Sequence, residues 1–221
     1  MHIEPGIVTG AKIVLSYATA AAAATFTVKT AIATLREQGV GSLLARSAMA
    51  TAAVFTFFQI LPHAPVGVSE VHLILGSSLF LMLGAAPAAI GLALGLLIQG
   101  IFFAPFDLPQ YGMNVTTLLV PLFGLQMLAK RLIAPGTAYV DLSYRQALAL
   151  STAYQGGIVA WVAFWAFYGQ GVAAFSSMAT FGAAYMTVVL IEPLVDLALL
   201  AAAKRIRGLE GSGLVTPRLF A

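Results

Sequence analysis

Long apolar stretches dominate the chain, and polar residues gather in the short connections between them. A helix needs roughly 20 mostly apolar residues to cross about 30 Å of hydrocarbon. The apolar runs are continuous and lack the every-second-residue alternation of a transmembrane β-barrel. The pattern therefore predicts an all-α bundle of about seven transmembrane helices, over residues 9–35, 43–61, 69–85, 87–105, 113–133, 146–169 and 176–203.

Glycine and proline mark the expected ends of these spans. Only Gly84 to Pro87 separates the third span from the fourth, so a tight helical hairpin is expected there. The other breaks fall at Gly39-Val40-Gly41, from Pro62 to Pro65, from Pro105 to Gly112, at Pro135-Gly136 and from Gly169 to Gly171.

Composition supports a membrane protein. Hydrophobic residues make up 60% of the chain and charged residues only 9%, whereas a soluble domain carries about 25% charged residues. The chain has no cysteine, which excludes thiolate metal sites, redox dithiols and cysteine nucleophiles. The chain is therefore expected to be an integral, multi-pass membrane protein.

The positive charges orient the bundle. Cytoplasmic loops of membrane proteins carry an excess of Lys and Arg. With seven spans, nine of the eleven basic residues lie on one side, so the N-terminus is expected outside and the C-terminus in the cytoplasm. Residues 1–207 then form a single transmembrane domain, and residues 208–221 a flexible cytoplasmic tail. The nine residues are Arg36, Arg46, Lys130, Arg131, Arg145, Lys204, Arg205, Arg207 and Arg218.

The three histidines lie on or near the expected outer face. His63 stands between two prolines in the second connection, which favours a surface residue. His72 lies in the first turn of the third span, behind Ser69 as a plausible N-cap. Histidine is the commonest metal ligand, but His72 can also be a packed residue in the first turn of a helix.

His2 has a further property because it follows the first residue. A free α-amine on Met1, the peptide nitrogen of His2 and its ring nitrogen can close two fused chelate rings around one ion. No basic segment precedes a short apolar core, so the mature chain is expected to start at Met1. A fourth nitrogen from another histidine would complete a square plane, which suits Ni(II) or Cu(II) and, in its low-spin form, Co(II), whereas Zn(II) prefers a tetrahedron. The alternative is a solvated terminal histidine.

The chain resembles the CbiM/NikM family, the substrate-capture components of cobalt and nickel energy-coupling-factor transporters. The similarity extends over essentially the whole chain, and the methionine-histidine start is its most specific part. The matching stretches are Met1-His2-Ile3 with Gly6, Pro65-Val66-Gly67 with Ser69, His72 and Gly76, then Gly112-Met113-Asn114-Val115, and Ile191-Glu192.

The resemblance implies a metal site and partners. Residues 1–8 would fold back into the bundle as a metal-binding loop. The ligands would be the Met1 amine, the amide and ring nitrogens of His2, and His72. Co(II) or Ni(II) would be the transported substrate, in the bilayer of a bacterial or archaeal cytoplasmic (inner) membrane, and cobalt would serve cobalamin biosynthesis. No nucleic acid and no organic cofactor are expected.

The resemblance also implies a membrane coupling protein and separate ATPase subunits. The chain has no Gly-x-x-x-x-Gly-Lys-[Ser/Thr] motif, so ATP hydrolysis through a P-loop is expected on partner subunits. The chain is thus expected to be a transport component and not an enzyme. The sequence does not decide between cobalt and nickel.

Two positions depart from the family pattern. The family spaces its serine and histidine by one residue, whereas Glu70 and Val71 both stand between Ser69 and His72. Thr117 stands where the family often has a second asparagine. The first departure bears on how Ser69 can orient the ring, and both bear on metal preference.

Polar side chains that hydrogen-bond the ligands are expected because a ligating imidazole usually donates its other N–H to an oxygen. The candidates are Ser69, Glu70 and Asn114, although Asn114 can equally be a helix N-cap. Within the membrane, Lys29 and Asp196 are expected at similar depth and are predicted to form an ion pair. Glu192 lies one turn before Asp196 on the same helical face, where it can guide an ion, contact a partner or serve the structure alone.

An alternative function from another class is a seven-helix membrane zinc hydrolase. It would use His2, His63 and His72 to activate water, with Glu70 or Asp107 as general base. The spacing of these histidines matches no compact zinc-hydrolase motif. His63 separates the two hypotheses, because only the hydrolase needs it.

Overall fold

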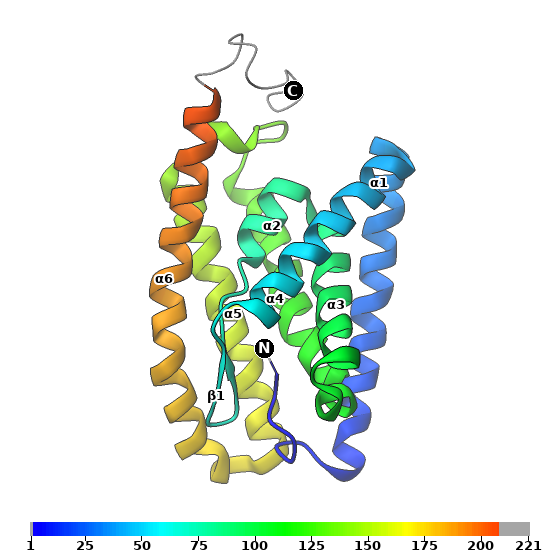
Figure 1. Cartoon of the computed structure of the whole chain (residues 1–221), viewed down its shortest axis with the longest axis vertical. Helices are drawn as coiled ribbons and strands as arrows, with labels where there is room; N and C mark the ends of the chain where they lie inside the picture. Colours follow the sequence, from blue (N-terminus) through cyan, green and yellow to red (C-terminus); the bar gives the residue numbers. More distant parts are fainter. Residues whose placement is uncertain (1, 208–221) are drawn as a thin grey trace.

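The computed structural model describes residues 2–207; Met1 and the expected tail at 208–221 lie outside the described residues. Most of the described chain is helical (Figure 1). In this described part of the chain, four helical stretches are long and apolar enough to cross a membrane: Gly10–Ile60, Ala85–Phe102, Pro105–Leu132 and Tyr144–Arg207. The all-α membrane class expected from the sequence agrees with this structure.

Helix α1 (Val14–Phe55) contains the first two predicted spans as its two arms. It breaks at Gly39, where φ is 82° and ψ is 165°, and Figure 1 shows its second arm returning across the bundle. The break predicted at Gly39 to Gly41 is therefore confirmed. A 3-10 turn, η1 (Gly10–Ile13), precedes α1, and a π-helical stretch, η2 (Thr56–Ile60), follows it.

The third predicted span is wrong over its first half. In place of a helix starting at Ser69, strands β1 (Ala64–Val66) and β2 (Ser69–Val71) form an antiparallel hairpin, and helix α2 covers only Gly76–Leu83. Ser69 is therefore not an N-cap. The hairpin turns at Gly67, whose φ of 64° is rarely adopted by other residues; a Cβ there would also lie 2.1 Å from the Ser177 carbonyl oxygen.

The remaining spans follow the prediction. Helix α2 ends at Leu83 and α3 begins at Ala85, so the tight hairpin expected at Gly84 is confirmed. Helix α5 starts with a capping box between Ser143 and Gln146. The elements after α2 are α3 (Ala85–Phe102), η3 (Pro105–Gln110), α4 (Tyr111–Leu132), η4 (Tyr139–Asp141), α5 (Tyr144–Gln170), η5 (Gly171–Ala174) and α6 (Phe175–Arg207).

The two ends of the molecule differ in charge. The break in α1, the loop between α4 and α5 and the end of α6 lie at one end, at the top of Figure 1. Eight of the nine basic residues named above lie within residues 2–207, and all eight belong to those segments or flank them. The N-terminal loop, η3, η5 and the tip of the hairpin lie at the opposite end. The structure thus gathers eight of these nine basic residues at one end, while Lys12 lies beside the end of α5 and Arg218 lies outside the described residues.

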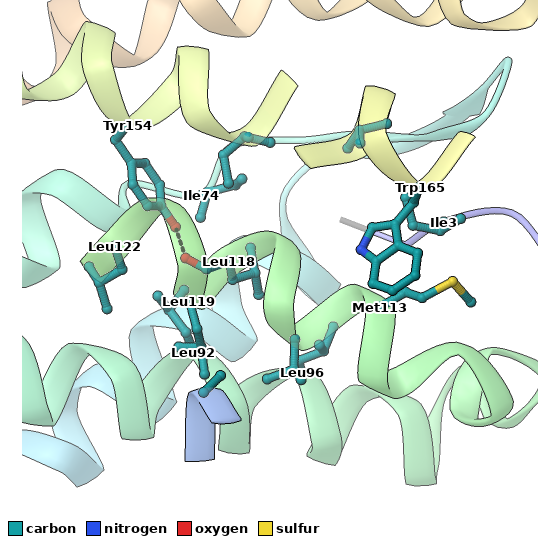
Figure 2. Packing of buried hydrophobic residues seen from close by; sticks show 14 of the residues in the cluster. Ile3, Ile74, Leu92, Leu96, Met113, Leu118, Leu119, Leu122, Tyr154 and Trp165 are labelled. Atoms are coloured by element: carbon teal, nitrogen blue, oxygen red, sulfur yellow. Dashed lines mark hydrogen bonds between the residues drawn. The ribbon is translucent and has the colours of Figure 1, made fainter. Parts of the chain in front are cut away.

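The core extends into the N-terminal segment. Tyr154 is fully buried and its hydroxyl donates to the Leu118 carbonyl at 3.3 Å (Figure 2). Ile3 is also fully buried, and Figure 2 shows it beside Met113 and Trp165. A chain terminus that buries a large apolar side chain is held inside the bundle by the hydrophobic effect.

Candidate metal-binding site

The N-terminal segment lies along the hairpin as an added strand. Ile3 forms an antiparallel bridge with Ser69. The Glu70 N–H donates to the His2 carbonyl at 3.0 Å, and the Glu4 N–H donates to the Val68 carbonyl at 3.0 Å. The Ser69 hydroxyl adds a bond of 2.8 Å to the His2 carbonyl. These bonds satisfy backbone groups in an apolar interior and fix the position of His2.

Asn114 holds the same segment from the other side. Its Oδ1 accepts the Ile3 N–H at 2.7 Å, and its side chain is only 1% exposed. Helix α4 begins three residues earlier, at Tyr111, without a side-chain cap. Asn114 is therefore not an N-cap; it binds the backbone next to His2.

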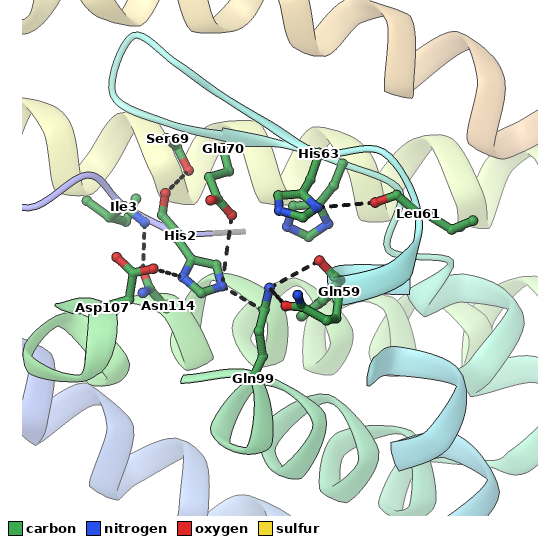
Figure 3. Close-up of polar contacts among 12 residues, drawn as sticks. His2, Ile3, Gln59, Leu61, His63, Ser69, Glu70, Gln99, Asp107 and Asn114 are labelled. Atoms are coloured by element: carbon green, nitrogen blue, oxygen red, sulfur yellow. Dashed lines mark hydrogen bonds and ion pairs between the residues drawn. The ribbon is translucent and has the colours of Figure 1, made fainter. Parts of the chain in front are cut away.

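The His2 ring is buried among acceptor oxygens, as Figure 3 shows. Its Nδ1 lies 2.6 Å from Asp107 Oδ2, and its Nε2 lies 2.9 Å from Gln99 Oε1. Gln99 is itself oriented by a bond from its Nε2 to the Phe58 carbonyl at 3.1 Å. Glu70 Oε2 lies 3.9 Å from His2 Nε2. Both ring nitrogens thus face acceptor oxygens.

Carboxylates make the surroundings of His2 electronegative. Burial raises the pKa of Glu4, and the negative charges of Glu70 and Asp107 raise it further. Lys12, in the same N-terminal segment, directs its ammonium group at the end of α5, where it donates to the Tyr168 and Gly169 carbonyls at 3.0 and 2.8 Å. A local excess of carboxylates attracts cations.

His72 lies in the irregular segment between β2 and α2, and not in the first turn of a helix as predicted. It is 3% exposed, and its ring meets the Phe58 ring edge-on with centroids 4.5 Å apart. Its Nδ1 lies 3.0 Å from the Leu73 carbonyl oxygen. Because a carbonyl only accepts, this contact places the proton on Nδ1 and the lone pair on Nε2. That is the tautomer in which Nε2 can bind a metal.

His63 is exposed, and its Nδ1 contacts the Leu61 carbonyl oxygen at 3.1 Å. Within residues 2–207 no group of three His, Asp or Glu side chains is placed to hold a metal ion. The three-histidine hydrolase site is therefore not assembled. The ligand set implied by the family resemblance is of another kind, because two of its ligands are backbone nitrogens. They are the amine of Met1, which lies outside the described residues, and the amide nitrogen of His2.

Comparison with known proteins adds to this geometry. The CbiM family, described as the cobalt uptake substrate-specific transmembrane region, matches residues 2–209. The chain belongs to the CbiM family. The resemblance drawn from the sequence is thereby confirmed. No curated protein matches the CbiM chain significantly.

Two crystal structures share the fold of this CbiM chain. The structure of a transition metal transporter is 19% identical, with a TM-score of 0.66 over 93% of both chains. That of a truncated transition metal transporter is also 19% identical, with a TM-score of 0.64 over 91% of this chain and 97% of the other.

Sequence reasoning missed two contacts of His2 in the CbiM chain. Gln99 was not considered, although a glutamine in the apolar run of 85–102 was a visible signal. The sequence places Asp107 on an acidic outer surface and offers it as the general base of a hydrolase, but does not indicate a bond to His2. Both side chains are buried, at 3% and 4% exposure, and their bond to His2 spans about a hundred residues of sequence.

The predicted Lys29–Asp196 ion pair is wrong. Asp196 is buried and accepts hydrogen bonds from the hydroxyls of Ser77 and Ser78. Lys29 is exposed on the first arm of α1, which lies across the bundle from α6 in Figure 1. Depth along two helices is readable from sequence, but the direction each side chain faces is set by helix packing.

Proposed function

We propose that this CbiM-family chain is the substrate-binding component of an energy-coupling-factor transporter for Co(II) or Ni(II) in the cytoplasmic membrane. Family membership supports metal uptake. The seven crossing elements would be the two arms of α1, the hairpin with α2, and α3 to α6. The basic end would face the cytoplasm by the positive-inside rule, which leaves His2 near the outer face.

One observation carries the site assignment: the N-terminal segment is inside the bundle with the His2 ring 3% exposed. A solvated terminal histidine has no reason to be buried among polar partners. The Met1 amine is one peptide unit away from His2. The proposed ligands are that amine, the His2 amide and Nδ1 nitrogens, and His72 Nε2. Four nitrogens in a plane suit Ni(II) or low-spin Co(II).

Metal capture requires a local rearrangement of His2. Only Nδ1 can close a chelate ring with the amide nitrogen of the same residue, and Nδ1 contacts Asp107 in this structure. The ion would therefore replace Asp107 as the partner of Nδ1. Asp107, Glu70 and Gln99 would remain close enough to stabilise the positive charge of the ion.

Ser69, Glu70 and Asn114 support the site through the backbone. Ser69 and the Glu70 N–H bind the His2 carbonyl, and Asn114 binds the Ile3 N–H. None of these bonds orients the His72 ring. The extra residue between Ser69 and His72 is accommodated because Ser69 lies in β2 and His72 in the irregular segment after it, and not in one helix.

The proposal is tested by titrating the purified protein with Ni(II), Co(II) and Zn(II) while recording absorption and bound metal. We expect one ion per chain and the absorption of a square-planar nitrogen site with Ni(II). Binding of Zn(II) in preference to Ni(II) and Co(II) would contradict the site. Uptake by cells is expected only when a coupling protein and ATPase subunits are produced with this chain.

Asn114→Leu is expected to weaken Ni(II) binding about tenfold. The substitution leaves the buried Ile3 N–H without an acceptor, which costs about 1–3 kcal/mol, and the cost falls on the docked form of the N-terminal segment. Asn114→Asp keeps an acceptor oxygen and serves as the control. Affinity is measured by competition with a chelator, and equal affinities for the leucine variant and the wild type would contradict this role.

His63→Ala is expected to leave Ni(II) affinity unchanged within about twofold, because the ring is exposed and contacts a neighbouring carbonyl. The same titration compares the variant with the unsubstituted chain. A large loss of affinity would instead place His63 among the ligands and revive a three-histidine site.

A further inference from the structure

The start of α2 needs acceptors that its own sequence does not provide. The first N–H groups of a helix have no intrahelical partner, and leaving them unpaired in an apolar interior is costly. Leu75, which precedes α2, provides no side-chain cap and has φ 54° and ψ 31°. Within residues 2–207 it is the only non-glycine residue with positive φ. Such a conformation persists only where its surroundings hold it.

Helix α6 brings two buried carboxylates to residues 74–78, just before α2 and in its first turn. Glu192 accepts hydrogen bonds from the Ile74 N–H and from Gln155 Nε2, one on each oxygen. One turn later, Asp196 accepts bonds from the hydroxyls of Ser77 and Ser78. Glu192 is 0% exposed and Asp196 is 3% exposed. Negative charge is favourable at a helix N-terminus.

The bond from Ile74 decides the conformation of the segment that carries His72. In the continuous helix that hydropathy predicts from residue 69, the Ile74 N–H would donate to the Glu70 carbonyl, four residues back. Here the same N–H donates to Glu192, and residues 72–75 belong to neither a helix nor a strand, with Leu75 in the left-handed conformation. Each helical residue turns by about 100°, so the choice between the two conformations determines where the His72 ring points.

Glu192 is itself held in place. Tyr185 donates from its hydroxyl to Gln155 Oε1 at 2.7 Å, which leaves Gln155 Nε2 directed at Glu192. Tyr185, Gln155 and Glu192 are all fully buried. These bonds hold the Glu192 carboxylate against the end of segment 72–75 next to α2, while the bonds of β2 to the N-terminal segment hold the other end.

We propose that Glu192 is a positioning residue for metal binding: it does not touch the ion, but it holds residues 72–75 in their non-helical conformation so that His72 reaches the metal. The inference rests on the proposed function, because it takes His72 as a ligand. Glu192 thereby links α6 to the metal site, although His72 and Glu192 are far apart in sequence.

The test compares Glu192→Leu and Glu192→Gln by Ni(II) titration of the full chain. The leucine variant is expected to show the absorption of His72→Ala, with water in the fourth position, and an affinity lower by about tenfold or more. The glutamine variant is expected to keep the wild-type absorption, because its amide oxygen accepts the Ile74 N–H and Gln155 can turn its amide to match. Ile191→Ala, an exposed neighbour on α6, is the control and should match the wild type.

The outcomes separate this inference from the proposed function. If the wild-type chain gives no square-planar absorption, both are overturned. If the wild type gives it and Glu192→Leu keeps the same absorption and affinity, only the positioning role is overturned. Should the leucine variant not yield monodisperse protein, Gln155→Leu replaces it, since it removes the bond that orients Glu192. Its absorption should shift toward that of His72→Ala, and an unchanged absorption would overturn the role.

Discussion

A chain with one extra residue before Met1 is expected to lose Ni(II) affinity by about 100-fold or more. The extension converts the α-amine into an amide and opens one of the two fused chelate rings. Loss of a group that only hydrogen-bonds a metal ligand already lowers metal affinity about 10–100-fold. Because the amine is proposed to be a ligand itself, its loss should cost at least as much. The added residue must also enter a region where His2 and Ile3 are 3% and 0% exposed.

The matched control is a chain with a protease site placed so that cleavage regenerates Met1. Affinity should be low before cleavage and return to the wild-type value afterwards. The comparison uses one preparation, so differences in folding or detergent do not enter. Full affinity in the uncleaved chain would show that the terminal amine is not a ligand.

His72→Ala is the second large effect: Ni(II) affinity is expected to fall by about 100-fold. The amine and the two His2 nitrogens would still hold the ion, and water would occupy the fourth position. The absorption should therefore shift to that of a site with three nitrogens and one oxygen. The loss should not exceed that caused by the N-terminal extension, which destroys the chelate.

The substitution of His72 also removes packing against Phe58, so stability must be measured separately. The melting temperature without metal shows the packing cost, and His72→Gln, which retains most of the volume, is the control for it. We expect His72→Gln to melt close to the wild type and still to lose affinity. Wild-type affinity in both variants would remove His72 from the ligand set.

Much of the fold was predictable because hydropathy and Gly or Pro act locally. The break at Gly39 and the hairpin at Gly84 were placed correctly because positive φ at these positions favours glycine. The third span failed for a different reason. Its residues are apolar enough for a helix, yet hydrogen bonds to distant partners turn the first half into a hairpin strand and an irregular segment.

The candidate site was predictable in part. The sequence nominated His2, Ser69, Glu70 and Asn114, and the structure brings them into one hydrogen-bonded cluster. The sequence did not indicate that Gln99 and Asp107 bind the His2 ring. Their roles depend on how α3 and η3 pack around the N-terminal segment, which no local pattern encodes.

By itself, the sequence determined the membrane class, most of the helix breaks, the gathering of basic residues at one end and the histidine that follows Met1. These features depend on side-chain hydrophobicity, charge and backbone preferences of neighbouring residues. Only the tertiary structure decided that the Ile74 N–H bonds to Glu192 on α6 and that His2 lies between Asp107 and Gln99. In an interior without water, polar groups need hydrogen-bond partners within the protein. For His2 and Ile74, helix packing places these partners about a hundred residues away in sequence.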